Sequence, residues 1–186
     1  MEPLVEFILI FLSYLLGCLN GAYYVGKLTA DQDIRELGST NAGARNAGRA
    51  FGRSAFIYTV IIDALKTIIP LLTAVYLAAA SDFLLGFIAL AVLLGHIWPV
   101  QLQFRGGKGV VVYLAAALAI APFTLFAAGI ILLIGLIIKR NFTIAGLIAL
   151  AAIPITLLIA SEYMLAGIFL MMLIIVIILH RKGDMR

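Results

Sequence analysis

Charged residues and cysteine are both scarce in this chain of 186 residues. Only 12% of the residues are charged, whereas 65% are hydrophobic, and the mean hydropathy is +1.18. A soluble domain of this size has too much surface to hide so much apolar side chain. The single cysteine, Cys18, excludes an internal disulfide. We therefore expect an all-α integral membrane protein with one polytopic membrane domain over residues 1–186.

Several signatures of known chemistry are missing as well. The sequence has no His/Cys pair at metal-ligand spacing and no HExxH motif, so we expect no metal site and no cofactor. It also has no GxSxG nucleophile motif. The net charge is +4, but the cations are spread over separate loops. A positive-inside topology explains this distribution better than a nucleic-acid partner does.

Long apolar runs are what the chain has instead. A bilayer core of about 30 Å needs about 20 apolar residues per helix. Five runs meet this requirement: Leu4 to Leu28, Ser54 to Ala80, Phe83 to Val100, Asn141 to Ala160 and Tyr163 to His180. A sixth stretch, Val110 to Ile138, is interrupted at Ala121-Pro122.

Charge predicts how the sixth stretch folds. Apart from Lys66, every Lys and Arg lies in one of five places: Lys27 to Arg53, Arg105 to Lys108, Lys139-Arg140, Arg181-Lys182 and Arg186. The connections at Ser81-Asp82 and Ser161-Glu162 carry only acid. With all basic loops in the cytoplasm, the stretch from Val110 to Ile138 must cross an even number of times. We expect seven transmembrane helices, two of them a short hairpin, with the N-terminus outside and the C-terminus cytoplasmic. Five spans plus a re-entrant hairpin would give the same topology.

The first polar stretch, GSTNAGARNAGRAFGR, begins at Gly38. Glycines such as Gly38 and Gly43 let a backbone approach a ligand closely, and successive amides form nests that bind anions. Ser39 and Asn41 add donors. This composition predicts an anion site beside the membrane.

Three arginines in the same stretch, Arg45, Arg49 and Arg53, recur every four residues. On a helix they would share one face, and a guanidinium can donate two hydrogen bonds to one phosphate. The alternative is a solvated basic loop that only fixes topology. The glycine-rich setting favours phosphate binding.

A second polar stretch, from Gly95 to Gly109, reads GHIWPVQLQFRGGKG. His96 is either a membrane-interface residue or a ligand contact. Gly106, Gly107 and Lys108 resemble the end of a phosphate-binding loop, but no Ser/Thr follows the lysine as in a Walker A motif. We expect this turn to open a helix whose amides face an anion, without nucleotide hydrolysis.

Three further polar residues lie inside or at the end of apolar runs. Asp63 and Lys66 stand three apart on the second span, where bare charges are costly. They either neutralise each other or orient a cation of the site. His180, near the end of the last span, is either an interface residue or a group that binds substrate or moves a proton.

Together, these segments resemble a known family. Residues Asp33 to Arg49 read DIRELGSTNAGARNAGR and Gly95 to Val110 read GHIWPVQLQFRGGKGV. They are similar to the first two motifs of the bacterial acyl-phosphate:glycerol-3-phosphate acyltransferases, the PlsY family. There are departures: Arg45 replaces the usual Thr, the third motif is faint around Thr143 to Gly146, and Gly183 stands where an Asn should follow His180.

The resemblance implies an activity. An acyl group would move from acyl phosphate to the 1-hydroxyl of glycerol 3-phosphate, giving lysophosphatidic acid and inorganic phosphate in phospholipid synthesis, without acyl-CoA. The site would lie on the cytoplasmic side of the bacterial inner membrane, in contact with membrane lipid. Ser39, Arg49 and Lys108 would be catalytic. The other expected site residues are Gly38, Asn41, Gly43, Arg45, Asn46, His96, Gly106, Gly107 and His180 for substrate, with Asp63 and Lys66 in support.

Two other classes fit an apolar protein with an anion site. A transporter of a phosphorylated metabolite would need polar residues through the bilayer, whereas here they collect towards one side. A non-catalytic lipid-binding scaffold is the third class. A further alternative within the enzyme class is a covalent acyl-Ser39 intermediate.

Overall fold

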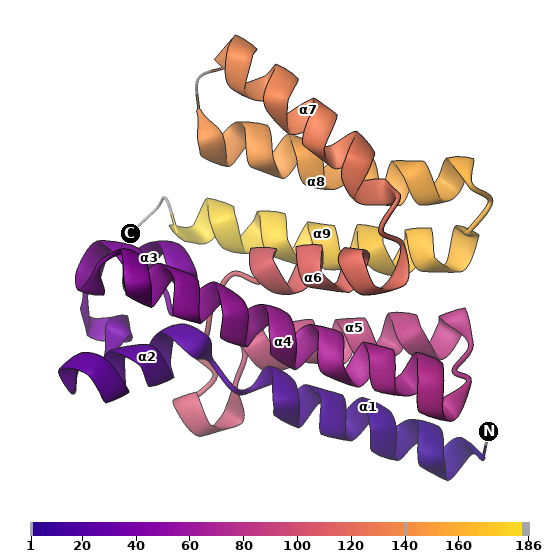
Figure 1. Ribbon diagram of the computed structural model, residues 1–186, viewed down its shortest axis with the longest axis horizontal. Helices are drawn as coiled ribbons and strands as arrows, with labels where there is room; N and C mark the ends of the chain where they lie inside the picture. Colours follow the sequence, from indigo (N-terminus) through magenta and orange to yellow (C-terminus); the bar gives the residue numbers. More distant parts are fainter. Residues whose placement is uncertain (1, 140, 184–186) are drawn as a thin grey trace.

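The computed structural model describes residues 2–139 and 141–183, and every regular element within those ranges is helical (Figure 1). The elements in chain order are α1 (Pro3–Gly17), α2 (Gly21–Ala30), the 3-10 turn η1 (Ile34–Glu36), α3 (Ala44–Phe51), α4 (Arg53–Ala78), α5 (Asp82–Ile97), the 3-10 turn η2 (Val100–Leu102), α6 (Val110–Ile120), α7 (Thr124–Lys139), α8 (Phe142–Ile159) and α9 (Tyr163–Gly183). Five of the described segments are long and apolar enough to cross a membrane. The expectation of an all-helical membrane protein is confirmed.

The first predicted span is broken into α1 and α2. Asn20 causes the break because it caps α2: its side-chain oxygen accepts a hydrogen bond from the backbone N–H of Tyr23 at 2.9 Å. Gly17, just before the break, packs so tightly against the backbone of Val92 on α5 that a Cβ there would overlap it. The break carries α2 away from α1 and towards the polar loops (Figure 1).

The stretch after the second motif forms two short helices, α6 and α7, as expected. The chain reverses direction at residues 121–123 (Figure 1). With 11 residues, α6 is about 16 Å long, well short of a bilayer core. However, α7 packs along α8 much more than along α6, so the two arms are not a closed hairpin.

The central helix is α5, which packs against α1, α4, α6 and α9. Its Leu84, Ile88 and Val92 are almost completely buried. Next to it, the rings of Tyr113 on α6 and Phe169 on α9 meet edge to face at 5.4 Å. This core fixes the spans relative to one another, and therefore also fixes the loops that leave them.

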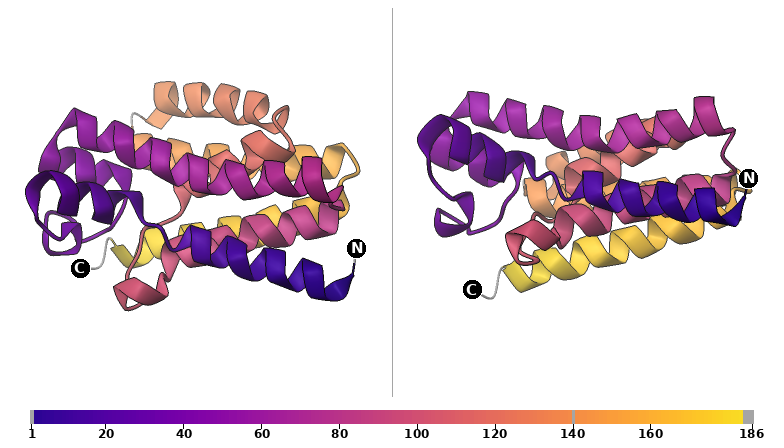
Figure 2. Two further views of the ribbon diagram at one scale, coloured as in Figure 1. Left: turned by 60° about the horizontal axis from the view of Figure 1, so that its bottom comes forward. Right: turned by 90° about the horizontal axis from the view of Figure 1, so that it is seen from below.

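The polar segments gather at one end of the bundle. In both Figure 1 and Figure 2, α2, α3 and the C-terminal end of α9 lie at the end opposite the start of α1. The short turn η2, drawn in pink, leaves α5 towards that same side. The two glycine-rich stretches, distant in sequence, therefore share one region of the molecule.

Candidate active site

Asn46 organises the first glycine-rich loop from inside. Its side-chain oxygen accepts a hydrogen bond from Ser39 N at 3.0 Å, and its Nδ2 donates to the carbonyls of Leu37 at 2.9 Å and Asn41 at 3.1 Å. The residue is only 2% exposed. Sequence reasoning assigned Asn46 to substrate, but the structure places its amide among loop atoms, where it holds Ser39 in position.

The same contact explains why Gly38 is a glycine. Its φ is +56°, and a Cβ there would lie 2.5 Å from Oδ1 of Asn46. Thr40 also adopts a positive φ of 57°. Ser39 thus projects from a tight turn between two left-handed residues, and its side chain is exposed.

The predicted arginine face is shorter than expected. Arg45 and Arg49 lie one turn apart on α3, and both are exposed. Gly52, with a φ of +90°, ends α3, and Arg53 begins α4, so it does not continue that face. Nη1 of Arg45 donates to Oγ1 of Thr143 at 2.9 Å, which ties α3 to the start of α8.

The second glycine-rich loop folds back onto the end of α5. Gly106 N donates to Ile97 O at 3.0 Å, and Gly107 N donates to His96 O at 3.1 Å. A Cβ on Gly106 would overlap the His96 carbonyl oxygen, and one on Gly107 would overlap the His96 ring. Lys108 follows, half-buried, directly before the residue that caps α6.

The two loops touch each other. A Cβ on Gly107 would lie only 2.8 Å from the carbonyl oxygen of Ala42. That oxygen also accepts a hydrogen bond from Nδ2 of Asn20 at 2.9 Å. Asn41 and Gly43, the neighbours of Ala42, are therefore brought beside the Gly107-Lys108 segment.

Arg35 joins the loops at a second point, and its role escaped the sequence analysis. Its Nη1 donates to Leu102 O at 2.7 Å, its Nη2 pairs with Asp33 at 2.6 Å, and its guanidinium stacks over the Tyr23 ring at 5.2 Å. The hydrogen bond from Arg35 holds the pKa of Asp33 below its usual value, and the same bond raises the pKa of Arg35. In the sequence, the two-residue spacing of Asp33 and Arg35 is the signal that could have predicted this ion pair.

Beneath the loops lies a buried polar cluster. Nζ of Lys66 is 2.9 Å from Oδ1 of Asp63, 2.9 Å from Nδ1 of His96 and 2.7 Å from Leu19 O. Asp63 also accepts a hydrogen bond from Gly21 N at 3.2 Å. Asp63, Lys66 and His96 are 1%, 5% and 3% exposed. Asp63 and Lys66 therefore neutralise each other, and the site residue they contact is His96 rather than an arginine.

His180 lies near the end of α9. Its Nδ1 is 2.8 Å from Val176 O in the preceding turn, and the side chain is partly buried. That end of α9 is on the same side of the bundle as α3 (Figure 1).

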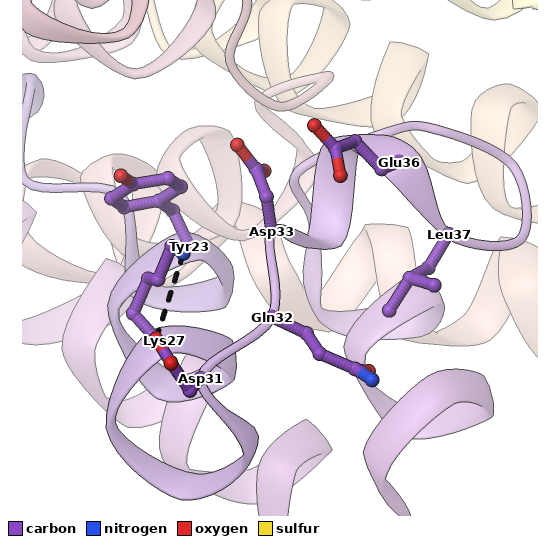
Figure 3. A pocket seen from close by; sticks show the side chains of 7 residues that line it. All are labelled: Tyr23, Lys27, Asp31, Gln32, Asp33, Glu36 and Leu37. Carbon is purple, nitrogen blue, oxygen red and sulfur yellow. Dashed lines mark ion pairs between the residues drawn. The ribbon is translucent and has the colours of Figure 1, made fainter.

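A cavity of about 410 Å³ opens between α2 and η1 (Figure 3). Its lining residues are Tyr23, Lys27, Asp31, Gln32, Asp33, Glu36 and Leu37. The lining therefore carries three carboxylates and one ammonium, and Lys27 pairs with Asp31 at 3.7 Å. This cavity would repel a phosphate, so the candidate anion site is the contact between the glycine-rich loops.

The predicted catalytic side chains are open to a ligand. No hydrogen bond or ion pair within the described residues involves the Arg49 guanidinium, the Lys108 ammonium or the Ser39 hydroxyl. A guanidinium on α3, together with an ammonium and a hydroxyl on the two loops, at the end of an apolar bundle, is suited to phosphate oxygens.

Both the sequence and the fold are similar to those of one enzyme family. The sequence matches the glycerol-3-phosphate acyltransferase family model over residues 7–186. It is 38% identical to glycerol-3-phosphate acyltransferase 1 of Bacillus cereus over 96% of this chain and 97% of that protein. It is 36% identical to the enzyme of that name from Desulfitobacterium hafniense over 97% and 89% of the two chains.

Solved structures agree with the sequence matches. The crystal structure of PlsY, an integral membrane glycerol 3-phosphate acyltransferase, in its glycerol 3-phosphate form has a TM-score of 0.88 and 30% identity. The match covers 98% of this chain and 91% of that one. The lysophosphatidic acid form of PlsY has a TM-score of 0.85. This chain belongs to the glycerol-3-phosphate acyltransferase family.

Proposed function

We propose that this protein transfers an acyl chain from acyl phosphate to the 1-hydroxyl of glycerol 3-phosphate, releasing lysophosphatidic acid and inorganic phosphate for phospholipid synthesis. Family membership supports this activity, and the related PlsY structures are described with glycerol 3-phosphate and with lysophosphatidic acid. The observation that carries the assignment here is the contact between Ala42 and Gly107, which joins the two polar loops at one end of an apolar bundle.

The site residues have different roles according to where they lie. Ser39, Arg49 and Lys108 hold phosphate oxygens, because their polar atoms are open to a ligand. Gly38, Gly43, Gly106 and Gly107 keep the loop backbone compact around them. The remaining members are Asn41, Arg45, His96 and His180 near the substrates, with Asn46, Asp63 and Lys66 as supports.

Catalysis is by direct transfer. Acyl phosphate is already activated, so aligning its carbonyl carbon with the glycerol hydroxyl supplies much of the acceleration. Cations fixed near the developing oxyanion and the leaving phosphate add electrostatic stabilisation. A substrate phosphate oxygen takes the hydroxyl proton, and Ser39 binds without becoming acylated. No acyl-CoA and no cofactor take part.

The protein forms one polytopic domain of the bacterial inner membrane. The five long spans and the short helices α6 and α7 make seven helices, with the N-terminus outside and the site and C-terminus in the cytoplasm, next to membrane lipid. The gathering of basic segments at one end supports this orientation. Labelling of cysteines introduced at Ser81 and Ser39 in intact cells tests it, because labelling of Ser39→Cys from outside would reverse the orientation.

The activity is tested by incubating purified protein with acyl phosphate and glycerol 3-phosphate and measuring phosphate and lysophosphatidic acid together. We expect equal release of the two products by the wild type, and a loss of at least about a hundredfold in Lys108→Ala. If the wild type shows no turnover, the remaining classes are a transporter and a non-catalytic scaffold.

Labelled acyl phosphate given alone should leave no stable label on Ser39, whereas a stable acyl-Ser39 would overturn direct transfer.

A further inference from the structure

Lys66 fixes the protonation of His96. An ammonium group has three protons to donate and no acceptor. Nζ of Lys66 has three acceptors around it: Leu19 O at 2.7 Å, Asp63 Oδ1 at 2.9 Å and His96 Nδ1 at 2.9 Å. With Lys66 as the ammonium partner of Asp63, an unprotonated Nδ1 of His96 completes its three acceptors, because a protonated Nδ1 would set two donors against each other. The imidazole is neutral, and its proton is on Nε2.

The Nε2 atom faces the second glycine-rich loop. It lies against Gly107, where a Cβ would overlap it, and the same position is 2.8 Å from Ala42 O. No hydrogen bond among the described residues uses Nε2. Every side-chain nitrogen or oxygen that is shut off from solvent in the described chain does have a partner. Nε2 is therefore open to solvent, although His96 as a whole is only 3% exposed.

An N–H held in this way is a donor without an acceptor. Because it is open to solvent, this N–H is free to donate to a water or to a bound ligand. Here the donor is aimed into the junction of the two loops that hold Ser39 and Lys108. A phosphate oxygen is an acceptor that suits both this N–H and the Lys108 ammonium.

We propose that the Nε2–H of His96 donates a hydrogen bond to an oxygen of a phosphate group bound on residues 106–108, and that Lys66 is a positioning residue that sets this tautomer. This proposal rests on the proposed function. Asp63 balances the charge of Lys66 and, through Gly21 N, anchors the cluster to the start of α2. His96 is therefore a neutral hydrogen-bond donor rather than the base that deprotonates the glycerol hydroxyl.

Two substitutions of His96 separate donation from packing. His96→Gln keeps an N–H near the Nε2 position, whereas His96→Asn keeps an acceptor for Lys66 but loses that N–H. We expect KM to rise about tenfold or more in His96→Asn and clearly less in His96→Gln. A rise for glycerol 3-phosphate alone, or for acyl phosphate alone, identifies whose phosphate is bound. Equal effects of the two substitutions, or no change in KM in either, would overturn the donor role.

The tautomer is tested directly by nitrogen-15 NMR of histidine-labelled wild-type protein in micelles, which does not depend on the kinetics of the variants. The chain has only two histidines, so the spectrum of His96→Gln assigns both. We expect His96 to have a protonated Nε2 and an unprotonated Nδ1, with the Nε2 resonance shifting when glycerol 3-phosphate or inorganic phosphate is added. A protonated Nδ1, or no shift with either ligand, would overturn the proposal. Absence of acyl transfer by the wild type would instead refute the proposed function and leave the tautomer result standing.

Discussion

Gly106 and Gly107 lie where the backbone passes directly over His96, and a side chain has no room there. The glycine-rich pattern around them predicted that the backbone comes close to another group, either a ligand or another part of the protein. Sequence alone could not tell whether the neighbour was a ligand or protein, because His96 and Ala42 reach the loop only through the tertiary fold. The same is true of Asn46. Its side-chain amide predicted hydrogen bonding, but its buried position, where both the oxygen and the nitrogen bond to the loop backbone, depends on the path of the loop.

Replacing Gly107 with alanine should disable the site. The added Cβ would overlap the imidazole and crowd Ala42 O, so the loop must move. A displacement of about 1 Å near reacting groups costs about a hundredfold in rate. Steady-state acyl transfer measures the effect, with Gly129→Ala on α7 as the control, because nothing lies within 4 Å of that position. Equal activity of the two variants would show that the loop contact has no role in turnover.

Elements were predicted well where hydropathy alone decides them. The bounds of α4, α5, α8 and α9 follow the apolar runs closely. The break between α1 and α2 was not predicted, because an apolar run continues through it and the cap depends on one residue, Asn20. The packing of α7 on α8 was not predicted either, since two apolar helices give no sequence signal for their partner.

The Asp33–Arg35 pair makes the joining of α2, η1 and the second loop sensitive to acid. The pKa of Asp33 is lower in the folded protein than its ordinary value, so the pair contributes stability above that ordinary value, about 3.9. This contribution is lost as the pH falls through the lowered pKa. Asp33→Asn should therefore lower the thermal unfolding midpoint at pH 7, and the difference from wild type should shrink below about pH 4.

The control for that experiment is Asp31→Asn. The carboxylate of Asp31 is 98% exposed and only loosely paired with Lys27, so its removal should change the midpoint little at either pH. A difference between wild type and Asp33→Asn that stays constant with pH would mean that the ion pair does not stabilise the loop junction.

At the scale of the whole molecule, the position of the charges predicted the arrangement of the loops. All cations other than Lys66 were expected on one side, and the described polar segments do gather at one end of the bundle (Figure 2). Among the residues that the structure describes, the buried charges Asp63 and Lys66 form one cluster with His96 instead of a polar path along the spans. The sequence alone does not predict that His96 belongs to this cluster, because His96 is on α5 whereas Asp63 and Lys66 are on α4.

The central claim is that cations from two distant loops hold one phosphate, and calorimetric titration of glycerol 3-phosphate into the wild type, Arg49→Ala and Lys108→Ala tests it most directly. Each lost contact to a charged group should weaken binding by about 10- to 150-fold. Arg53→Ala, which removes the same charge from the start of α4, should weaken binding much less. Wild-type affinity in Arg49→Ala or Lys108→Ala, or an equal loss in Arg53→Ala, would contradict the account.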